Sequence, residues 1–428
     1  MKLLLVKHNC FLVIFVCFLF YSCKNPESDD YFLYMPREKV QTNFIIYMAA
    51  DNNLERFALQ NISDMKKIGS TDNCNIIVLL DRAFGYDKSE DDWTDTRLFL
   101  LTKDNRSFNY DLVYSFNELD MTQSSTLEMF LLFCDNNFPS ENTVLTIWSH
   151  GTGVFPDGMF ENNINLGVNK SVIHDYTAGY DKSMSIKDLS SVLTEFVNKR
   201  NKKIDILIFD SCLMQMVEIC WELKDVSNII IASQGDVPAG GFDYTSLVSL
   251  FTEKSLLDEI TISSEIVDSF YAKYNMSLIN TSCSALNMNY FNQFSESFIK
   301  WSRILVESLS DYSKIKEIRE SLYSYSSIYK EFIDLPSLLK LFYNSNFENK
   351  NLNKVSKNLE LVLQNFVISN KVTNEYNSLL CGISINFPST IYEFSFYKEE
   401  NCNDSLKIFN ESFWNEFLNN YYTLLNSN

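Results

Sequence analysis

The chain has 428 residues and a formal net charge of −19 at pH 7. That length suits one large α/β unit with an appendage, or two domains. Hydrophobic residues make up 46% of the chain and charged residues 21%, so a sizeable core can form. The negative charge argues against nucleic acid as a partner, because a polyphosphate would be repelled.

The start of the chain predicts export and a lipid anchor. Two lysines precede an apolar run at 10–21, which is too short to cross a bilayer comfortably and matches the hydrophobic region of a secretory signal. Cys23 follows a small residue and precedes a polar stretch, as in a bacterial lipobox. We therefore expect a lipoprotein signal peptide at 1–22, a tether at 23–42 and lipidation at Cys23. The protein would then be anchored in the bacterial cell envelope, at the outer membrane. An ordinary signal peptide cut nearby is the alternative.

Beyond the tether, apolar runs of strand length alternate with helical patterns. The predicted strands are 43–50, 75–81, 97–102, 112–116, 143–148, 204–209 and 229–233, and the helices between them are 54–68, 122–133 and a stretch that begins at 185. Runs that are apolar on both faces, with helices between them, indicate a parallel sheet covered on both sides. From about residue 247 onward the pattern is mostly helical, with strand-like segments at 282–287 and 382–387 and a polar connection at 342–358.

Two residues with catalytic chemistry lie at predicted strand ends. His150 follows the strand at 143–148, and Cys212 follows the strand at 204–209. Ligands bind beyond the carboxyl ends of parallel strands, and a strand–helix–strand crossover commonly places its two strands side by side. We also expect a helix at 213–223, whose N-terminus would lower the pKa of the Cys212 thiol. A cysteine nucleophile with a nearby histidine is what acyl transfer requires.

Neighbouring residues have simpler interpretations. Gly151 lets backbone amides approach a ligand closely and could help to form an oxyanion pocket. His174 lies among turn residues and is expected to be solvated, and Asp51–Asn53 is expected to cap the following helix. The alternative for the pair itself is that His150 is a structural histidine and Cys212 a buried filler.

Four segments, in the same order, resemble the clostripain family of cysteine peptidases. They are 47–54 (Tyr-Met-Ala-Ala-Asp-Asn-Asn-Leu), 149–151 (Ser-His-Gly), 210–214 (Asp-Ser-Cys-Leu-Met) with Glu218, and 381–388 (Cys-Gly-Ile-Ser-Ile-Asn-Phe-Pro). The resemblance implies a caspase-like α/β fold, with a mostly parallel sheet, helices on both faces and a largely helical C-terminal region. It places the peptidase core at 43–246 and a helical and mixed region that completes the fold at 247–428.

The resemblance also implies an endopeptidase that cleaves after Arg or Lys, with His150 and Cys212 as its catalytic dyad. Asp210, two residues before the nucleophile, maps onto the specificity pocket of the family, where a carboxylate could pair with the substrate cation. Asp236 is a second acidic candidate for that pocket, and a turn residue beside Pro and Gly is its alternative. Family members are often activated by self-cleavage between the histidine and the cysteine, which points to Lys170 here.

The sequence also departs from the family pattern. Ser211 and Gln215 stand where the family more often has Ala and Gly, which leaves the dyad intact and puts substrate preference in question. The sequence requires no cofactor and shows no metal-ligand spacing. Calcium stays open, because some relatives depend on it although this chain has no EF-hand-like loop.

The expected partners are protein or peptide substrates with basic residues, and a membrane reached through the lipid anchor. The main alternative is a non-catalytic surface lipoprotein, a binding module with a peptidase-like fold. A preference for acidic substrates is disfavoured because Asp210 would repel them. A metallohydrolase is disfavoured because the mature chain keeps only two histidines.

Overall fold

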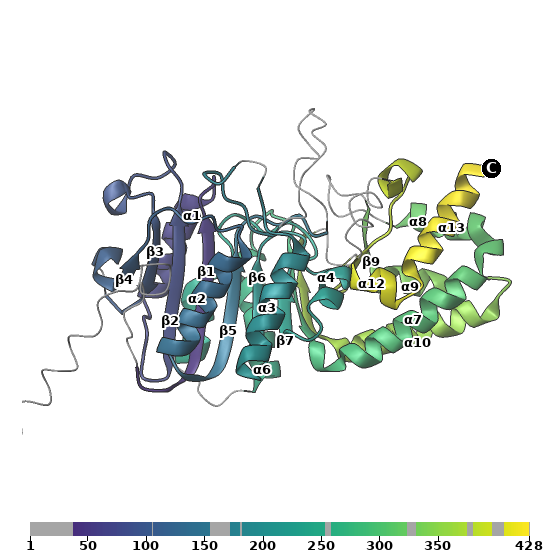
Figure 1. Cartoon of the computed structure of the whole chain (residues 1–428). Coiled ribbons are helices and arrows are strands. Elements are labelled where there is room, and N and C mark those ends of the chain that lie inside the picture. The colour runs from purple at the N-terminus through teal and green to yellow at the C-terminus, as the bar shows by residue number, and fades with distance from the viewer. Residues whose placement is uncertain are drawn as a thin grey trace, which may run out of the picture. The chain divides into compact units, whose positions relative to one another are not determined.

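A long mixed sheet runs through the computed structural model (Figure 1). In the described part of the chain it has nine strands in the order β10-β8-β7-β6-β5-β1-β2-β3-β4. The strands are β1 (Val40–Ala50), β2 (Cys74–Arg82), β3 (Thr96–Leu100), β4 (Leu112–Ser115), β5 (Ser140–Trp148), β6 (Ile204–Asp210), β7 (Ser227–Ala232), β8 (Ser282–Asn287) and β10 (Val367–Val372). The five central strands, from β7 to β2, are parallel to one another. The two strands at either end join them antiparallel.

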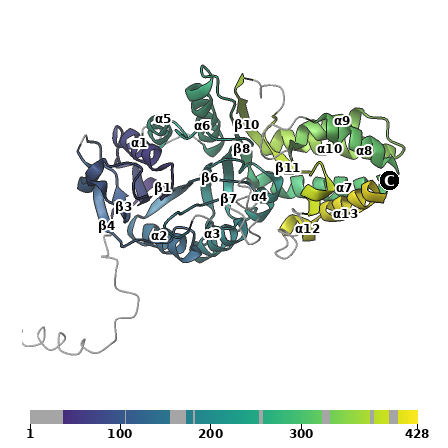
Figure 2. The same ribbon diagram turned by 90° about the horizontal axis from the view of Figure 1, so that it is seen from above.

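Helices cover both faces of the sheet, and others lie beyond its β8 and β10 end. The helices are α1 (Glu55–Lys66), α2 (Ser124–Asn137), α3 (Ile186–Arg200), α4 (Val217–Glu222), α5 (Tyr244–Thr252), α6 (Glu259–Tyr274), α7 (Phe291–Glu307), α8 (Tyr312–Ser321), α9 (Leu335–Asn344), α10 (Lys350–Phe366), α12 (Lys407–Glu411) and α13 (Trp414–Ser427), with short 3₁₀ turns at Glu90–Asp92, Phe108–Asp111, Met288–Tyr290 and Leu309–Asp311. Figure 2 shows α1, α5 and α6 over one face and α2 and α3 over the other. The prediction of an α/β fold with a mostly parallel, doubly covered sheet is confirmed.

The structure describes residues 37–104, 106–154, 172–179, 182–252, 258–322, 331–374, 380–395 and 406–427. These belong to one compact unit, Arg37–Asn428. The predicted signal peptide, Cys23 and Lys170 lie outside the described residues. No helix among the described residues is long and apolar enough to cross a membrane.

Burial on both faces explains why the central strands read as continuous apolar runs. Every residue of β2 and β6 is buried, and in β1 only one residue is partly exposed. The parallel strands therefore lack the alternation of a sheet that faces water on one side. A polar contact crosses this core, where the Trp148 indole N–H donates to Asn61 Oδ1 at 3.0 Å.

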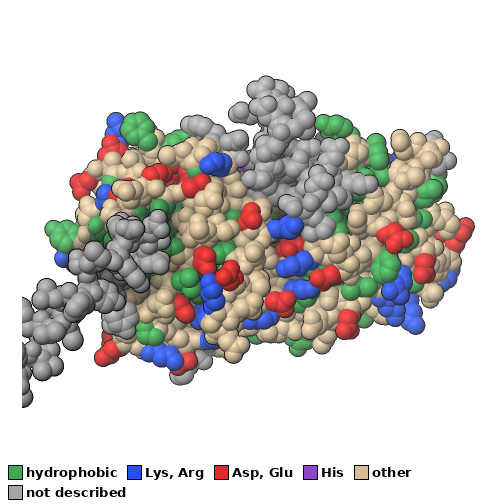
Figure 3. Space-filling view, in the orientation of Figure 1, with side chains coloured by type: hydrophobic (Ala, Val, Ile, Leu, Met, Phe, Trp, Pro, Cys, Tyr) green, Lys and Arg blue, Asp and Glu red, His purple; other side chains and the backbone are tan. Residues whose placement is uncertain are grey.

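The surface over α2 and α3 is mixed in charge. Figure 3 shows acidic and basic side chains interspersed on this face. Lys199 on α3 pairs with Glu128 on α2 at 2.7 Å, and such exposed pairs contribute at most about 1 kcal/mol each. The net negative charge is therefore not gathered into one patch on this face.

The region after residue 247 contributes strands to the main sheet and forms a group of helices beyond its β8 and β10 end. It supplies β8 and β10, and its helices α7, α9, α10 and α13 pack on one another (Figure 2). The predicted strand at 382–387 is β11 (Ser384–Asn386), which pairs antiparallel with β9 (Phe332–Asp334) in a separate small sheet. The prediction of a polar connection at 342–358 is wrong, because α10 buries Leu352, Leu359 and other apolar residues at helical spacing. The division into 43–246 and 247–428 stays a prediction.

Candidate active site

The tips of β5 and β6 bring the segments of His150 and Cys212 together. The two strands are parallel neighbours with Trp148 opposite Asp210, as the sequence predicted. Past the strand ends, Ser211 Oγ donates to the Ser149 carbonyl at 3.0 Å. A Cβ atom added to Gly151 would lie 2.5 Å from the carbonyl oxygen of Cys212 and 3.2 Å from its nitrogen. The residue after His150 therefore lies directly against the backbone of Cys212, and only glycine fits there.

The thiol of Cys212 is held by the loop that follows β7. Its Sγ accepts a hydrogen bond from the Val237 backbone N–H at 3.2 Å, and the thiol donates to the Val237 carbonyl at 3.7 Å. The side chain is partly exposed. Burial, and secondarily the charge of Asp236, raise the pKa of the Cys212 thiol to about 12. This raised pKa favours the neutral thiol over the thiolate.

Residues 213–216, which the structure describes, are not helical, so the prediction of a helix directly after Cys212 is wrong. The prediction that a helix N-terminus lowers the pKa of the thiol is wrong for the same reason. Leu213 has a positive φ of 65°, and α4 begins only at Val217. Gln215 N–H donates to the Ser233 carbonyl at 3.0 Å, which ties the intervening segment to the chain after β7. The thiol consequently lacks the stabilisation that a helix N-terminus would give a thiolate.

His150 is oriented by two residues from other parts of the chain. Its Nε2 lies 2.7 Å from Asn53 Oδ1, and its ring packs edge-on against that of His174, with centroids 5.5 Å apart. His174 is buried, so the prediction of a solvated histidine is wrong. Capping by Asp51–Asn53 is also wrong, because the N-cap of α1 is Leu54 and no side chain caps it. Asn53 instead contacts His150.

Asp210 is the last residue of β6, two residues before Cys212. The side chain is buried, and its Oδ2 accepts hydrogen bonds from the Tyr244 hydroxyl at 2.9 Å and the Phe242 N–H at 3.3 Å. Burial raises the pKa of Asp210 to about 6, against the effect of the Tyr244 hydrogen bond. Lys273 Nζ donates to the carbonyls of Gly240, Gly241 and Phe242, which fixes the loop that covers the carboxyl group.

Asp236 differs from Asp210 in being exposed. It precedes Val237, the residue that hydrogen-bonds the thiol, and its own carbonyl accepts from Thr281 Oγ1 at 2.8 Å. Its charge is close enough to raise the pKa of Cys212. The two acidic candidates thus occupy different positions, with Asp210 buried under the loop and Asp236 at the surface beside the thiol.

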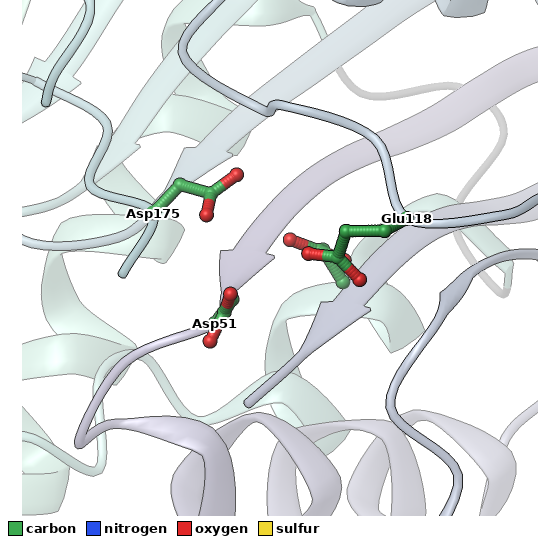
Figure 4. A group of neighbouring side chains, drawn as sticks. Asp51, Glu118 and Asp175 are labelled. Carbon is green, nitrogen blue, oxygen red and sulfur yellow. The ribbon is translucent and has the colours of Figure 1, made fainter. Parts of the chain in front are cut away.

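Four acidic residues near the site form a group that the sequence did not predict. Ligand oxygens of Asp51, Asp81, Glu118 and Asp175 all lie within 4.8 Å of one another. Figure 4 shows the side chains of Asp51, Glu118 and Asp175 converging on a common space. Asp51 and Asp81 lie at the carboxyl ends of two neighbouring parallel strands, so the strand-end argument that found His150 could have found this pair as well.

The sequence pattern of a known family extends over the whole of this fold. The profile of the clostripain family matches residues 46–421. The chain belongs to the clostripain family of cysteine peptidases. Clostripain from Hathewaya histolytica is 26% identical over 230 residues, which are 48% of this chain and 41% of that protein. The chain therefore spans less than half the length of that relative.

Two solved structures are similar in fold. One is a secreted C11 cysteine protease from Bacteroides thetaiotaomicron, determined with an irreversible peptide inhibitor; it has a TM-score of 0.64 and 18% identity over 88% of this chain and 99% of that chain. The other is an inactive zymogen C11 protease from Parabacteroides distasonis, with a TM-score of 0.62, 18% identity and the same two coverages. At this identity the likeness concerns the fold, which agrees with the predicted caspase-like architecture.

Proposed function

We propose that this chain is a cysteine endopeptidase that cleaves after Arg or Lys, with Cys212 as nucleophile and His150 as general acid and base. The observation that carries the proposal is the contact at Gly151, which sets the segment bearing His150 against the backbone of Cys212. Both residues follow the carboxyl ends of neighbouring parallel strands, where ligands bind. Family membership supports this choice of chemistry.

Because the raised pKa of Cys212 favours the neutral thiol, its proton must leave Sγ as the sulfur attacks the substrate. Nε2 of His150 lies 2.7 Å from Asn53 Oδ1, which supports Nδ1 as the atom that transfers the proton. Nδ1 accepts the proton as Sγ of Cys212 attacks the substrate carbonyl. It then donates that proton to the leaving amine as the peptide bond breaks, and water hydrolyses the thioester in the second half of the reaction.

The negative oxygen that forms during attack needs hydrogen-bond donors close to Cys212. The backbone N–H of Gly151 is a candidate, because a Cβ on this residue would already touch the Cys212 nitrogen and carbonyl. Removing a donor of this kind typically costs about a hundredfold or more in rate. Glycine is suited to the position because any side chain would push the two strand ends apart.

The two aspartates suit a basic residue at the cleavage site. Asp236 is exposed and precedes the residue that hydrogen-bonds the thiol, whereas Asp210 is buried and contacts the 240–242 loop. The charge of Asp236 raises the pKa of Cys212, so a cationic side chain that pairs with Asp236 would remove part of this effect and favour the thiolate. A basic substrate would therefore assist the ionisation of its own nucleophile.

We also propose that self-cleavage after Lys170 activates the enzyme and that Cys23 carries a lipid anchor in the cell envelope. The loop between His150 and Cys212 in the sequence contains Lys170, and a chain of similar fold is described as an inactive zymogen. Mass spectrometry of the active form should find a new N-terminus at Ser171. Labelling with a palmitate analogue should mark the wild-type chain and spare Cys23→Ala.

The experiment that tests the main proposal is hydrolysis of fluorogenic peptides ending in Arg, Lys, Asp or Ala by the full chain with a reductant. Cleavage after Arg or Lys should vanish in Cys212→Ala and persist in Cys220→Ala, a change at a buried cysteine in α4. No cleavage by the wild type, even after nicking between residues 151 and 184, would instead favour the non-catalytic binding module.

A further inference from the structure

The loop between α6 and β8, residues 275–280, carries the two most exposed large hydrophobic side chains in the described part of the chain. Leu278 is 99% exposed and Met276 is 93% exposed, and Ile279 beside them is 44% exposed. Single exposed hydrophobic residues are common on protein surfaces, whereas a contiguous group of them marks a contact surface. This aliphatic loop also contains no charged residue, although the chain has a net charge of −19. Its surface therefore suits an apolar partner.

Hydrogen bonds hold the aliphatic loop in a defined path, although its apolar side chains are exposed. The Ile279 carbonyl accepts from Asn374 Nδ2 at 2.8 Å and from Thr373 Oγ1 at 2.7 Å. Asn374 Nδ2 also donates to the Ser277 carbonyl at 3.0 Å, so the segment after β10 supports the loop at two points. A ligand that binds these side chains therefore meets a backbone that is already ordered, which lowers the entropy cost of binding.

The aliphatic loop is joined at both ends to the proposed substrate site. After the loop, Thr281 Oγ1 donates to the Asp236 carbonyl at 2.8 Å. Before the loop, the hydroxyl of Tyr274, the last residue of α6, donates to the Gly241 carbonyl at 2.7 Å, in the segment that contacts Asp210. Figure 2 shows α6 beside β8 and β10, and the three elements are in contact. The aliphatic loop therefore borders the place where the basic side chain of a substrate would bind.

The order of the strands indicates which part of a substrate would pass this loop. His150 follows β5, Cys212 follows β6, and Asp236 lies in the loop after β7. The next strand, β8, is antiparallel to β7, so the aliphatic loop that precedes it lies at the same edge of the sheet. Because His150 is proposed to protonate the leaving amine, the residues after the cleaved bond would lie toward β5. The residues before the cleaved bond would then extend past Asp236 toward β8.

Peptide geometry selects the substrate residue that reaches the loop. Neighbouring strands are about 4.8 Å apart, so β8 lies roughly 10 Å from β6, the strand that Cys212 follows. In an extended peptide, residues two positions apart are about 7 Å apart and share one side. Asp210 contacts Tyr244 on α5, and α5 and α6 cover one face of the sheet, so the basic side chain and the loop after α6 belong to the same face. The residue two positions before the basic residue matches both the distance and the face.

We propose that Met276, Leu278 and Ile279 form a subsite for an aliphatic side chain two positions before the basic residue of the substrate. The inference rests on the proposed peptidase and adds an apolar determinant of specificity to the acidic one. Contact between the two apolar surfaces removes both from water, which favours the complex. A charged side chain at this position would lose water without gaining a partner, because the loop carries no charge. The preferred substrate thus has an aliphatic residue, any residue, and then Arg or Lys.

The test compares cleavage by the full chain of Arg peptides that carry Leu, Ser or Asp two positions before the Arg. We expect kcat/KM to be about tenfold higher for the Leu peptide than for the Ser peptide, and lower again for the Asp peptide. A chain with both Met276→Ser and Leu278→Ser should lose about tenfold in kcat/KM for the Leu peptide and stay within about twofold for the Ser peptide. Both changes are at exposed positions, so this variant should fold like the wild type. The control Leu361→Ser, at an exposed position of α10, should cleave all three peptides as the wild type does.

A binding measurement separates the subsite from the proposed peptidase. Fluorescence anisotropy of dye-labelled peptides with Cys212→Ala reports affinity without turnover, and the Leu peptide should bind about tenfold more tightly than the Ser peptide. Cleavage after Arg without a preference for Leu, or a preference that the double variant retains, would overturn the subsite and leave the peptidase standing. Tighter binding of the Leu peptide that the double variant loses, without cleavage by the wild type, would uphold the subsite and refute the peptidase. Neither binding nor cleavage would overturn both.

Discussion

The imidazole of His150 packs edge-on against that of His174, with ring planes inclined by 75°. His174 is itself fixed, because it is buried and its backbone N–H donates to Ser149 Oγ at 3.2 Å. The buried ring of His174 beside His150, the proposed general base, limits the rotation of the His150 side chain. Orientation of this kind affects the rate of the chemical step more than the affinity for substrate.

We predict that His174→Ala lowers kcat about tenfold and leaves KM nearly unchanged, because the cavity lets the His150 ring rotate. His174→Phe keeps an aromatic ring at the same place and should retain kcat to within about threefold. Steady-state kinetics with an Arg peptide measures both constants. Equal losses in the two variants would mean that His174 acts through a polar contact and not through ring packing.

The raised pKa of Asp210 predicts opposite effects of pH on stability and on substrate affinity. The folded chain holds the Asp210 proton up to about pH 6, whereas an unfolded aspartate releases it near pH 4. The contribution of Asp210 to the free energy of unfolding is therefore lost as pH rises from about 4 through 6, by roughly 3 kcal/mol. Binding of a basic substrate needs the carboxylate, so KM should fall over the same range. Asp210→Asn should remove both dependences, which denaturant titrations and kinetics between pH 4 and 8 would measure.

Asp236→Asn should separate thiol ionisation from substrate binding. The charge of Asp236 contributes to the high pKa of Cys212, so its removal should speed alkylation of the thiol by iodoacetamide several-fold at fixed pH. Cleavage after Arg should slow, because the cation loses a partner. Faster alkylation with unchanged kcat/KM for Arg peptides would exclude Asp236 from the substrate site and leave Asp210 as the acidic determinant.

The parts of the fold that sequence predicted best are those governed by local patterns. Continuous apolar runs identified β5 and β6, and their order in a strand–helix–strand unit predicted the adjacency on which the proposed dyad depends. The helix between them begins where the sequence predicted, and Ser185 caps it, since its Oγ accepts from Asp188 N–H at 3.0 Å. These features depend on residues close in the chain, so one sequence suffices to find them.

The segment after Cys212 shows where such patterns fail. Residues 213–223 are apolar enough to read as one helix, yet Leu213 has a positive φ and its N–H donates to the Gly235 carbonyl at 3.0 Å. Met216 then bridges to Ser384, which is far away in the sequence. These contacts with the loop after β7 and with β11 hold residues 213–216 in a non-helical path, and neither partner can be recognised from the local sequence.

The acidic group was missed for a different reason. Its members, Asp51, Asp81, Glu118 and Asp175, come from four segments and follow no ligand motif. The neighbouring parallel strands β1 and β2 bring the first two together, and the loops after β4 and before α3 supply the others. Only strand order makes them neighbours, and the sequence gives no direct sign of that order for β3 and β4.

Gly241 is the position where a single methyl group should disturb the proposed pocket most. It has a φ of +57°, and a Cβ there would lie 2.2 Å from Asp210 Oδ2. Gly241→Ala should therefore lower the free energy of unfolding by about 2 kcal/mol or more and raise KM for Arg peptides, because the loop must move away from Asp210. Gly240→Ala is the matched control, since the nearest atoms to its Cβ would be the Tyr274 hydroxyl at 3.3 Å and Lys273 Nζ at 3.5 Å. Urea titrations and kinetics on both variants test this, and equal effects would show that a side chain at either glycine disturbs the loop independently of Asp210.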